Sequence, residues 1–168
     1  MNLFGKEPRP VFNDIMIEEL ANDIGKDVHK WCQQNNEYID LEDCIEAAKS
    51  IIIWHLNDNG YQLAKEFEDK LMISPDTELT EILDDVSWQA DKILERYVKA
   101  WVKSDDIKAD LPIGSIVRIK IKNKDVEGEI VQIYDDVAKY GVCVESLGQV
   151  KGKSHYLVHF ENVGCVPA

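Results

Sequence analysis

Residues 113–134 (IGSIVRIKIKNKDVEGEIVQIY) constrain the fold of this chain more than any other stretch. Apolar and basic side chains alternate along their first half, at Val117, Arg118, Ile119, Lys120, Ile121 and Lys122. A period of two residues is typical of a strand with one buried face. Residues 123–125 have the composition of a turn, and Gly128 in the second half predicts a bulge or a sharp bend. We therefore expect a β-hairpin here.

The period of two continues toward the C-terminus. Residues 142–144 predict a third strand, and residues 156–160 predict a fourth. Residues 163–167 predict a short last strand or a 3₁₀ turn. Five short strands in about 55 residues are too few for a sandwich but enough for a small barrel.

The chain ahead of the hairpin follows a helical period of three and four residues instead. Four helices are expected, over residues 13–34, 40–56, 61–71 and 75–104. Asn13 and Asp40 are predicted N-caps, and Ser74 is predicted to cap the last helix with Pro75 in its first position. A polar segment, residues 105–112, predicts a hinge between the helices and the strands.

Two details of these helices predict their packing. Gly25 lies in the middle of the first helix at a cost of about 1 kcal/mol relative to Ala, so we expect a neighbouring helix to cross closely there. Residues 51–54 (Ile-Ile-Ile-Trp) are apolar on every side of the second helix. This pattern predicts that the second helix is the buried centre of the bundle.

The sequence thus predicts a segregated α+β chain with two domains. Residues 1–109 are expected to form an acidic four-helix bundle, and residues 110–168 a small five-stranded β-barrel.

Four segments of the last third carry a resemblance: Gly114-Ser-Ile-Val, Glu127-Gly-Glu-Ile-Val, Tyr156-x-Val-x-Phe160 and Val166-Pro167. They resemble the SH3-like barrels of the KOW and Tudor type. The resemblance implies a module that binds RNA, DNA, peptides or proteins, rather than a chemistry. A Tudor-type aromatic cage would have to draw on four rings, Tyr134, Tyr140, Tyr156 and Phe160, of which Tyr156 or Phe160 is expected in the core. The helical part carries no such resemblance.

The net charge of −13 is distributed unevenly. Residues 1–109 contain 12 Lys and Arg against 24 Asp and Glu, whereas residues 110–168 contain 7 against 8. An acidic surface repels nucleic acid and anionic lipid and favours basic protein surfaces. Six acidic residues are the predicted protein-binding residues: Glu18, Asp23, Asp84, Asp85, Asp91 and Glu95. Solubility alone is the competing explanation, since basic residues are interleaved on the last helix.

The function expected from this charge is non-catalytic. The acidic bundle is predicted to engage a basic protein surface, as in nucleic-acid mimicry, a phage-type inhibitor of a defence nuclease, or toxin immunity. The alternative is a nucleic-acid- or ribosome-associated factor that binds through the barrel, with a basic strip of Arg118, Lys120, Lys122 and Lys124. An enzyme ranks third, because no acid, base and nucleophile converge in the pattern.

No cofactor or metal is predicted. Residues 55–66 match an EF-hand loop at Gly60 and Glu66, but His55 stands where the first Asp is needed. An Asn-Gly turn between helices explains the same residues. A zinc site built from His155 and His159, with Cys143 and Cys165 nearby, is a weaker hypothesis than surface histidines.

The cysteines and the N-terminus bear on location. Cys32, Cys44, Cys143 and Cys165 include no C-x-x-C pair, and Cys32 and Cys44 fall in helical patterns, where a free thiol behaves as a small apolar side chain. Neither a signal-peptide segment nor a membrane-spanning run is present. We therefore expect a cytoplasmic, bacterial or phage protein with reduced thiols and no membrane partner.

Overall fold

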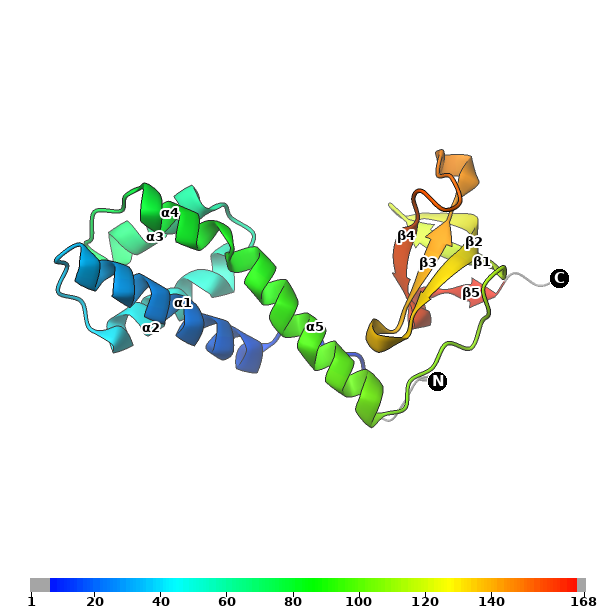
Figure 1. Ribbon diagram of the computed structural model, residues 1–168, viewed down its shortest axis with the longest axis horizontal. Helices are drawn as coiled ribbons and strands as arrows, with labels where there is room; N and C mark the ends of the chain where they lie inside the picture. Colours follow the sequence, from blue (N-terminus) through cyan, green and yellow to red (C-terminus); the bar gives the residue numbers. More distant parts are fainter. Residues whose placement is uncertain (1–6, 166–168) are drawn as a thin grey trace. The chain divides into compact units, whose positions relative to one another are not determined.

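The computed structural model describes residues 7–165, and of Cys165 the backbone alone. Helices fill the first part of the chain and an antiparallel sheet fills the last, so the segregated α+β prediction is confirmed (Figure 1). The helices are α1 (Asp14–Gln34), α2 (Leu41–His55), α3 (Gly60–Leu71), α4 (Thr77–Asp84) and α5 (Val86–Ser104).

The chain packs as two compact units. The helical unit is Val11–Arg96. The sheet unit is Tyr97–Ala168 together with the segment ahead of Val11, of which residues 7–10 are described. The chain thus passes between the units at Pro10 and again within α5. The predicted domain boundary after residue 109 concerns independent folding and stays a prediction.

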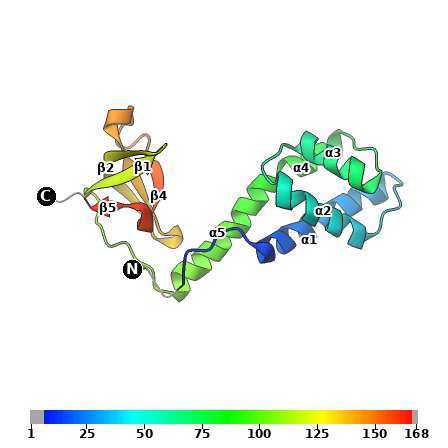
Figure 2. The same cartoon turned by 180° about the vertical axis from the view of Figure 1, so that it is seen from behind.

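The helical unit is centred on the pairing of α1 with α2, which lie side by side in both views (Figures 1 and 2). A Cβ at Gly25 would lie 2.6 Å from Cγ1 of Ile45 and 2.7 Å from its Cα. The close crossing predicted at Gly25 is therefore confirmed. Asn13 caps α1 as expected, because its side chain accepts a 3.2 Å hydrogen bond from the Met16 N–H. Cys32 is fully buried, as a small apolar side chain would be.

The second helix differs from its prediction. Ile51 and Ile52 are buried, but Ile53 is 49% exposed and Trp54 is 82% exposed. A run of four apolar residues covers every side of a helix, and neighbours pack against only one side of α2. The prediction of a buried central helix was therefore wrong at its C-terminal end.

The last predicted helix is divided. Asp85 (φ −86°, ψ −3°) breaks the helical run, so that α4 and α5 replace one helix over residues 75–104. The start is also later than predicted, because Asp76 rather than Ser74 is the N-cap. The Asp76 carboxylate accepts hydrogen bonds of 2.9 Å from the Leu79 N–H and from the indole N–H of Trp31. The second bond is a tertiary contact, which local sequence does not reveal.

The sheet unit contains β1 (Ile116–Ile121), β2 (Lys124–Tyr134), β3 (Lys139–Cys143), β4 (Tyr156–His159) and β5 (Gly164–Cys165). They pair in the order β4-β3-β2-β1-β5, all antiparallel (Figure 1). The predicted five-stranded barrel is not what the chain forms. Four strands make a curled sheet, the two residues of β5 add to its edge, and no pairing within the described residues joins β5 to β4.

The hairpin is confirmed, with two corrections. Its turn is Lys122-Asn123 rather than residues 123–125, and both residues have positive φ (46° and 64°). Two positive φ angles in a two-residue loop are those of a type I′ turn, which matches the twist of the strands. The irregularity in β2 lies between Ile130 and Gln132 rather than at Gly128. Gly128 instead permits close packing, since a Cβ there would lie 2.8 Å from the Cys143 carbonyl oxygen.

The core of the sheet unit holds Tyr140 against Phe160, with ring centroids 4.3 Å apart. The Tyr140 hydroxyl donates to Oδ1 of Asp110 (2.9 Å) and accepts from the N–H groups of Asp110 and Leu111 (both 3.1 Å). Burial, with the Asp110 carboxylate nearby, raises the pKa of Tyr140 to about 12. Asp110 and Leu111, near the end of the segment predicted as a hinge, are therefore tied to the sheet by a buried hydroxyl.

Candidate protein interface

An exposed tryptophan lies among the acidic residues of α4 and α5. Trp88 is 60% exposed, whereas Val86, Ala90 and Ile93 on the other side of α5 are buried. Residues three, four and seven positions away share a helix face with Trp88. We define the Trp88 face as Asp84, Asp85, Trp88, Asp91, Lys92 and Glu95. Asp91 and Glu95 thus share a face of α5 with a ring that the core does not use, and Asp84 and Asp85 lie one turn before it, at the junction of α4 and α5.

Lys92 is the basic residue of the Trp88 face. Its Nζ lies 5.5 Å from the centroid of the Trp88 ring and 3.4 Å from Oε2 of Glu95. A cation over the face of an indole is attracted by the ring quadrupole, by about 0.5–1 kcal/mol at an exposed site. Lys92 therefore holds the ring orientation while the carboxylates of Asp85 and Asp91 remain exposed.

Asp84 links this face to the start of α3. Its Oδ1 accepts a 2.6 Å hydrogen bond from the Gly60 N–H, and a Cβ at Gly60 would collide with the Thr80 carbonyl oxygen and with Asp84. The next residue, Tyr61, is 63% exposed, and Trp54 lies on the last turn of α2 just before. Exposed aromatic rings and carboxylates therefore occur together at this end of the helical unit.

The other two predicted acidic residues lie elsewhere, on α1. Glu18 accepts a 2.6 Å hydrogen bond from Nζ of Lys49, and this bond and the charge of Lys49 lower the pKa of Glu18. Asp23 lies 3.5 Å from Nζ of Lys26. Their described contacts are with these lysines rather than with the Trp88 face. The structure does not bring all six residues to one place.

The net negative charge of the protein belongs entirely to the helical unit. Residues 11–96 contain 21 Asp and Glu against 7 Lys and Arg, a net charge of −14. The rest of the chain contains 11 against 12, a net charge of +1. The separation is sharper by packing unit than by the predicted domains.

The predicted basic strip is divided among three places. Arg118 pairs with Glu127 across the hairpin at 3.2 Å. Lys120 and Lys122 line a groove that they share with β4, although Lys122 lies in the turn rather than on the strand. Lys124 begins β2 and does not line the groove.

The histidines have other partners. Nε2 of His155 lies 2.9 Å from the Tyr134 hydroxyl, and Nδ1 of His159 lies 3.9 Å from Glu161. His55 lies 2.8 Å from Asp58 in the turn between α2 and α3, whose sequence matches an EF-hand loop only in part. The part of the chain that the structure describes contains no group of three potential metal ligands. Cys143 is buried, and the side chain of Cys165 is outside the described part.

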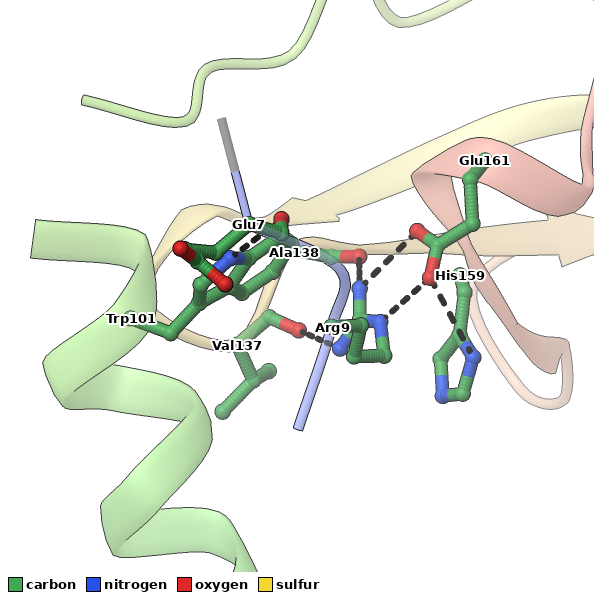
Figure 3. Close-up of polar contacts among 7 residues, drawn as sticks. All are labelled: Glu7, Arg9, Trp101, Val137, Ala138, His159 and Glu161. Atoms are coloured by element: carbon green, nitrogen blue, oxygen red, sulfur yellow. Dashed lines mark hydrogen bonds and ion pairs between the residues drawn. The ribbon is translucent and has the colours of Figure 1, made fainter. Parts of the chain in front are cut away.

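A second polar cluster, on the sheet unit, surrounds Arg9 (Figure 3). Its guanidinium pairs with Glu161 at 2.5 Å, donates to the carbonyl oxygens of Val137 (3.0 Å) and Ala138 (2.7 Å), and lies 5.1 Å from the Trp101 ring centroid. The Trp101 indole N–H in turn donates to the Glu7 carbonyl oxygen (3.1 Å). These bonds hold residues 7–10 against the sheet, so the cluster is structural rather than a site for a ligand.

Sequence reasoning missed both Trp88 and Arg9. A signal existed for Trp88, because it falls off the apolar stripe of its helix and has Asp85 and Asp91 three residues to either side. No signal existed for Arg9, whose partners lie far away in sequence.

Among residues 7–165 no helix has both the length and the hydropathy to span a bilayer. Comparison with protein-family models, with curated proteins and with solved structures gives no match for this chain.

Proposed function

We propose that this protein is a non-catalytic binding protein whose Trp88 face engages a basic surface of a protein partner. The observation that carries the proposal is the 60% exposure of Trp88 between Asp85 and Asp91. Tryptophan is enriched among the residues that dominate binding energy at protein interfaces. Surrounding carboxylates accelerate encounter with a basic partner and select against acidic ones. The arrangement combines an aromatic side chain that a partner can bury with carboxylates that attract a basic partner.

The charge of the helical unit favours one kind of partner. A net charge of −14 over residues 11–96 is complementary to a channel that binds nucleic acid. Occupation of such a channel is the action of a nucleic-acid mimic, of a phage-type inhibitor of a defence nuclease, or of an immunity protein that covers a nuclease toxin. We place the protein in this group of inhibitors.

We further infer that the sheet unit is SH3-like. Two observations support this inference: the strand order β4-β3-β2-β1-β5, and the 3₁₀ turn Phe160–Asn162 between β4 and β5. Binding of nucleic acid or a ribosome through this unit is the second candidate, favoured by Lys120 and Lys122 at the groove. The whole-chain charge of −13 opposes it, because a polyanion must approach against that field.

Charge reversal on matched faces tests the first proposal. The partner is captured by cross-linking in the native host, purified, and titrated calorimetrically at rising NaCl. Trp88→Ala should weaken binding about 30-fold, the loss of a typical interface anchor. Asp85→Lys with Asp91→Lys should weaken it and flatten the salt dependence. The matched control, Asp27→Lys with Asp69→Lys, makes the same change in net charge at exposed helical positions outside the Trp88 face.

Equal losses from the two charge reversals, or full binding by Trp88→Ala, would contradict an interface at the Trp88 face. The second candidate is separated in the same series. Changing Arg118, Lys120 and Lys122 to Glu should leave this partner bound, and the unaltered protein should show no binding to mixed-sequence RNA or DNA at physiological salt. Submicromolar oligonucleotide binding abolished by that triple change would reverse the ranking.

A further inference from the structure

A groove of about 700 Å³ runs along β4 in the sheet unit. All four residues of β4, Tyr156–His159, line it, and the end of β1 with the hairpin turn (residues 120–122) forms its other side. Its volume is within the range of about 300–1,000 Å³ found for ligand sites. No residue of β2 or β3 lines the groove. It therefore follows the side of β4 that faces away from β3.

β4 is an edge strand on that side. It pairs with β3 alone, at the end of the sheet order. In an antiparallel pair only alternate residues bond to the neighbouring strand, so the other residues direct their N–H and C=O groups outward. Within the described residues no backbone partner is recorded for these outward groups. An edge of this kind is a template for another extended chain.

The side chains around the groove are apolar and basic. Leu157 is 58% exposed, and Ile121 and Val158 are half-buried. Lys120 and Lys122 are exposed, and no ion pair is recorded for either in the described part of the chain. Asp125 is the residue opposite Lys120 across the hairpin. A second carboxylate, Glu161, lies beside the groove-lining His159 but is paired with Arg9. The two lysines therefore leave the groove with an excess of positive charge.

We infer that this groove binds an extended acidic segment of a protein partner, which adds as a strand to the free edge of β4. Every second side chain of an added strand faces the same way, with a repeat of about 6.6 Å. Acidic side chains at alternate positions then reach Lys120 and Lys122, while the apolar ones between them face the core side and contact Ile121 and Val158.

The occupant is a peptide rather than a nucleic acid for two reasons. Unpaired backbone groups along β4 are completed by another peptide backbone, which a nucleic acid does not provide. A long polyanion is also repelled by the protein's net charge of −13, whereas a short acidic segment has few charges and is repelled less. The site lies on the sheet unit, so it is independent of the Trp88 face.

The test uses the full-length protein and a synthetic peptide, acetyl-TEVEVET-amide, labelled with fluorescein. Binding is followed by fluorescence anisotropy at 0.05 M NaCl. Lys120→Glu with Lys122→Glu should weaken binding about tenfold, as expected for the loss of two partly exposed ion pairs and their reversal. The matched control, Arg118→Glu with Lys124→Glu, gives the same net charge outside the groove and should change the affinity less than twofold. The neutral peptide TQVQVQT, which keeps the backbone and the valines but offers no charge to the lysines, should bind more weakly than TEVEVET.

Backbone pairing is tested separately from charge. With TEVEVET bound, the outward amides of β4 should exchange hydrogen at least tenfold more slowly by NMR, and the β2 amides should not change. The neutral variant Lys120→Gln with Lys122→Gln removes the two positive charges without adding negative ones. Its affinity for TEVEVET should be about threefold weaker.

The inference would be overturned by no binding of TEVEVET at 1 mM, by equal losses in the groove and control variants, or by no protection of β4. It would also be overturned by displacement of the peptide by oligo(dT) at lower concentration. The last result would assign the groove to nucleic acid. Concentration-dependent dimers that the Lys120→Glu, Lys122→Glu variant abolishes would instead assign it to a second copy of this chain.

Discussion

Arg9 is a charged side chain that is only 10% exposed. Its burial is tolerated because the N–H groups of the guanidinium donate to the Glu161 carboxylate and to two backbone carbonyl oxygens, and one of its faces lies over the Trp101 ring. A planar guanidinium satisfies several acceptors at fixed angles, which an ammonium does not. Removing one partner of such a group leaves a charge without compensation. Arg9 therefore holds residues 7–10 against the sheet, a role that its position between two prolines in the sequence does not indicate.

The same cluster predicts a dependence of stability on pH. Burial, and repulsion by Arg9, lower the pKa of His159 below its ordinary value of 6.5. The unfolded chain then binds a proton at a higher pH than the folded chain does. The free energy of unfolding should therefore fall as the pH drops below about 6.5, until His159 titrates in the folded state as well. Urea unfolding at pH 7.5, 6.5, 5.5 and 5.0 measures the decline.

The variant His159→Gln identifies the group responsible. Its free energy of unfolding should decline less than that of the unaltered protein between pH 6.5 and 5.5, because the titrating imidazole is gone. Identical slopes for the two proteins would show that His159 does not contribute.

At the scale of elements, contacts between helices decided where helices begin, cross and break. α4 begins at Thr77 because the Asp76 carboxylate binds the indole of Trp31 as well as its own helix. α1 and α2 approach closely because Gly25 has no side chain at the crossing. The glycine that weakens α1 as an isolated helix thus permits the pairing on which the helical unit is built.

Gly25→Ala separates these two effects. Helix propensity alone would stabilise the variant by about 1 kcal/mol. The added methyl group, however, would lie 2.7 Å from the Cα of Ile45, a backbone atom that cannot move without shifting α2. Overpacking usually costs about 1–3 kcal/mol, so after the gain in propensity we expect a net loss of up to about 2 kcal/mol, measured by urea unfolding. Gly25→Val should lose more, and a raised midpoint for Gly25→Ala would mean that the crossing is looser than the structure shows.

At the scale of the whole molecule, charge is segregated between the packing units. Residues 11–96 carry −14 and the rest carries +1. A high net charge keeps a protein dissolved and directs it to oppositely charged partners. The like charges also repel one another, however, which destabilises the folded state. Selection for stability alone would not favour this excess. It is consistent with a surface used for binding.

Salt should therefore stabilise the helical unit. Raising NaCl from 0.01 to 0.15 M shortens the screening length from about 30 to about 8 Å, so that repulsion among its carboxylates weakens. We expect the melting temperature, followed by circular dichroism at 222 nm, to rise by about 4 °C or more. In the variant Asp27→Lys with Asp69→Lys the rise should be smaller, since its net charge is less negative. A salt-independent melting temperature in both proteins would argue against repulsion in the folded state.

The candidate interface was predictable in part. Asp91 and Glu95 share a face with Trp88 because helical spacing along α5 places them there, whereas Asp84 and Asp85 lie at the break between α4 and α5. The position of Trp88 off the apolar stripe of its helix was a signal in the sequence. The degree of its exposure was not predictable, because it depends on which side of α5 the neighbouring elements occupy. The groove beside β4 was also hidden, since Lys120 and Lys122 meet β4 only after the sheet curls.

The sequence by itself determined the class and order of the elements. Periods of two and of three to four residues follow from the geometry of one strand or one helix, so the hairpin at residues 116–134 and the helices ahead of it were legible locally. The tertiary structure decided which faces are covered, such as the exposure of Trp54, the cap at Asp76 and the burial of Arg9. Each of these depends on a partner distant in the chain. Local sequence patterns predict whether a segment forms a helix or a strand. Which of its side chains stay exposed for binding depends on tertiary packing.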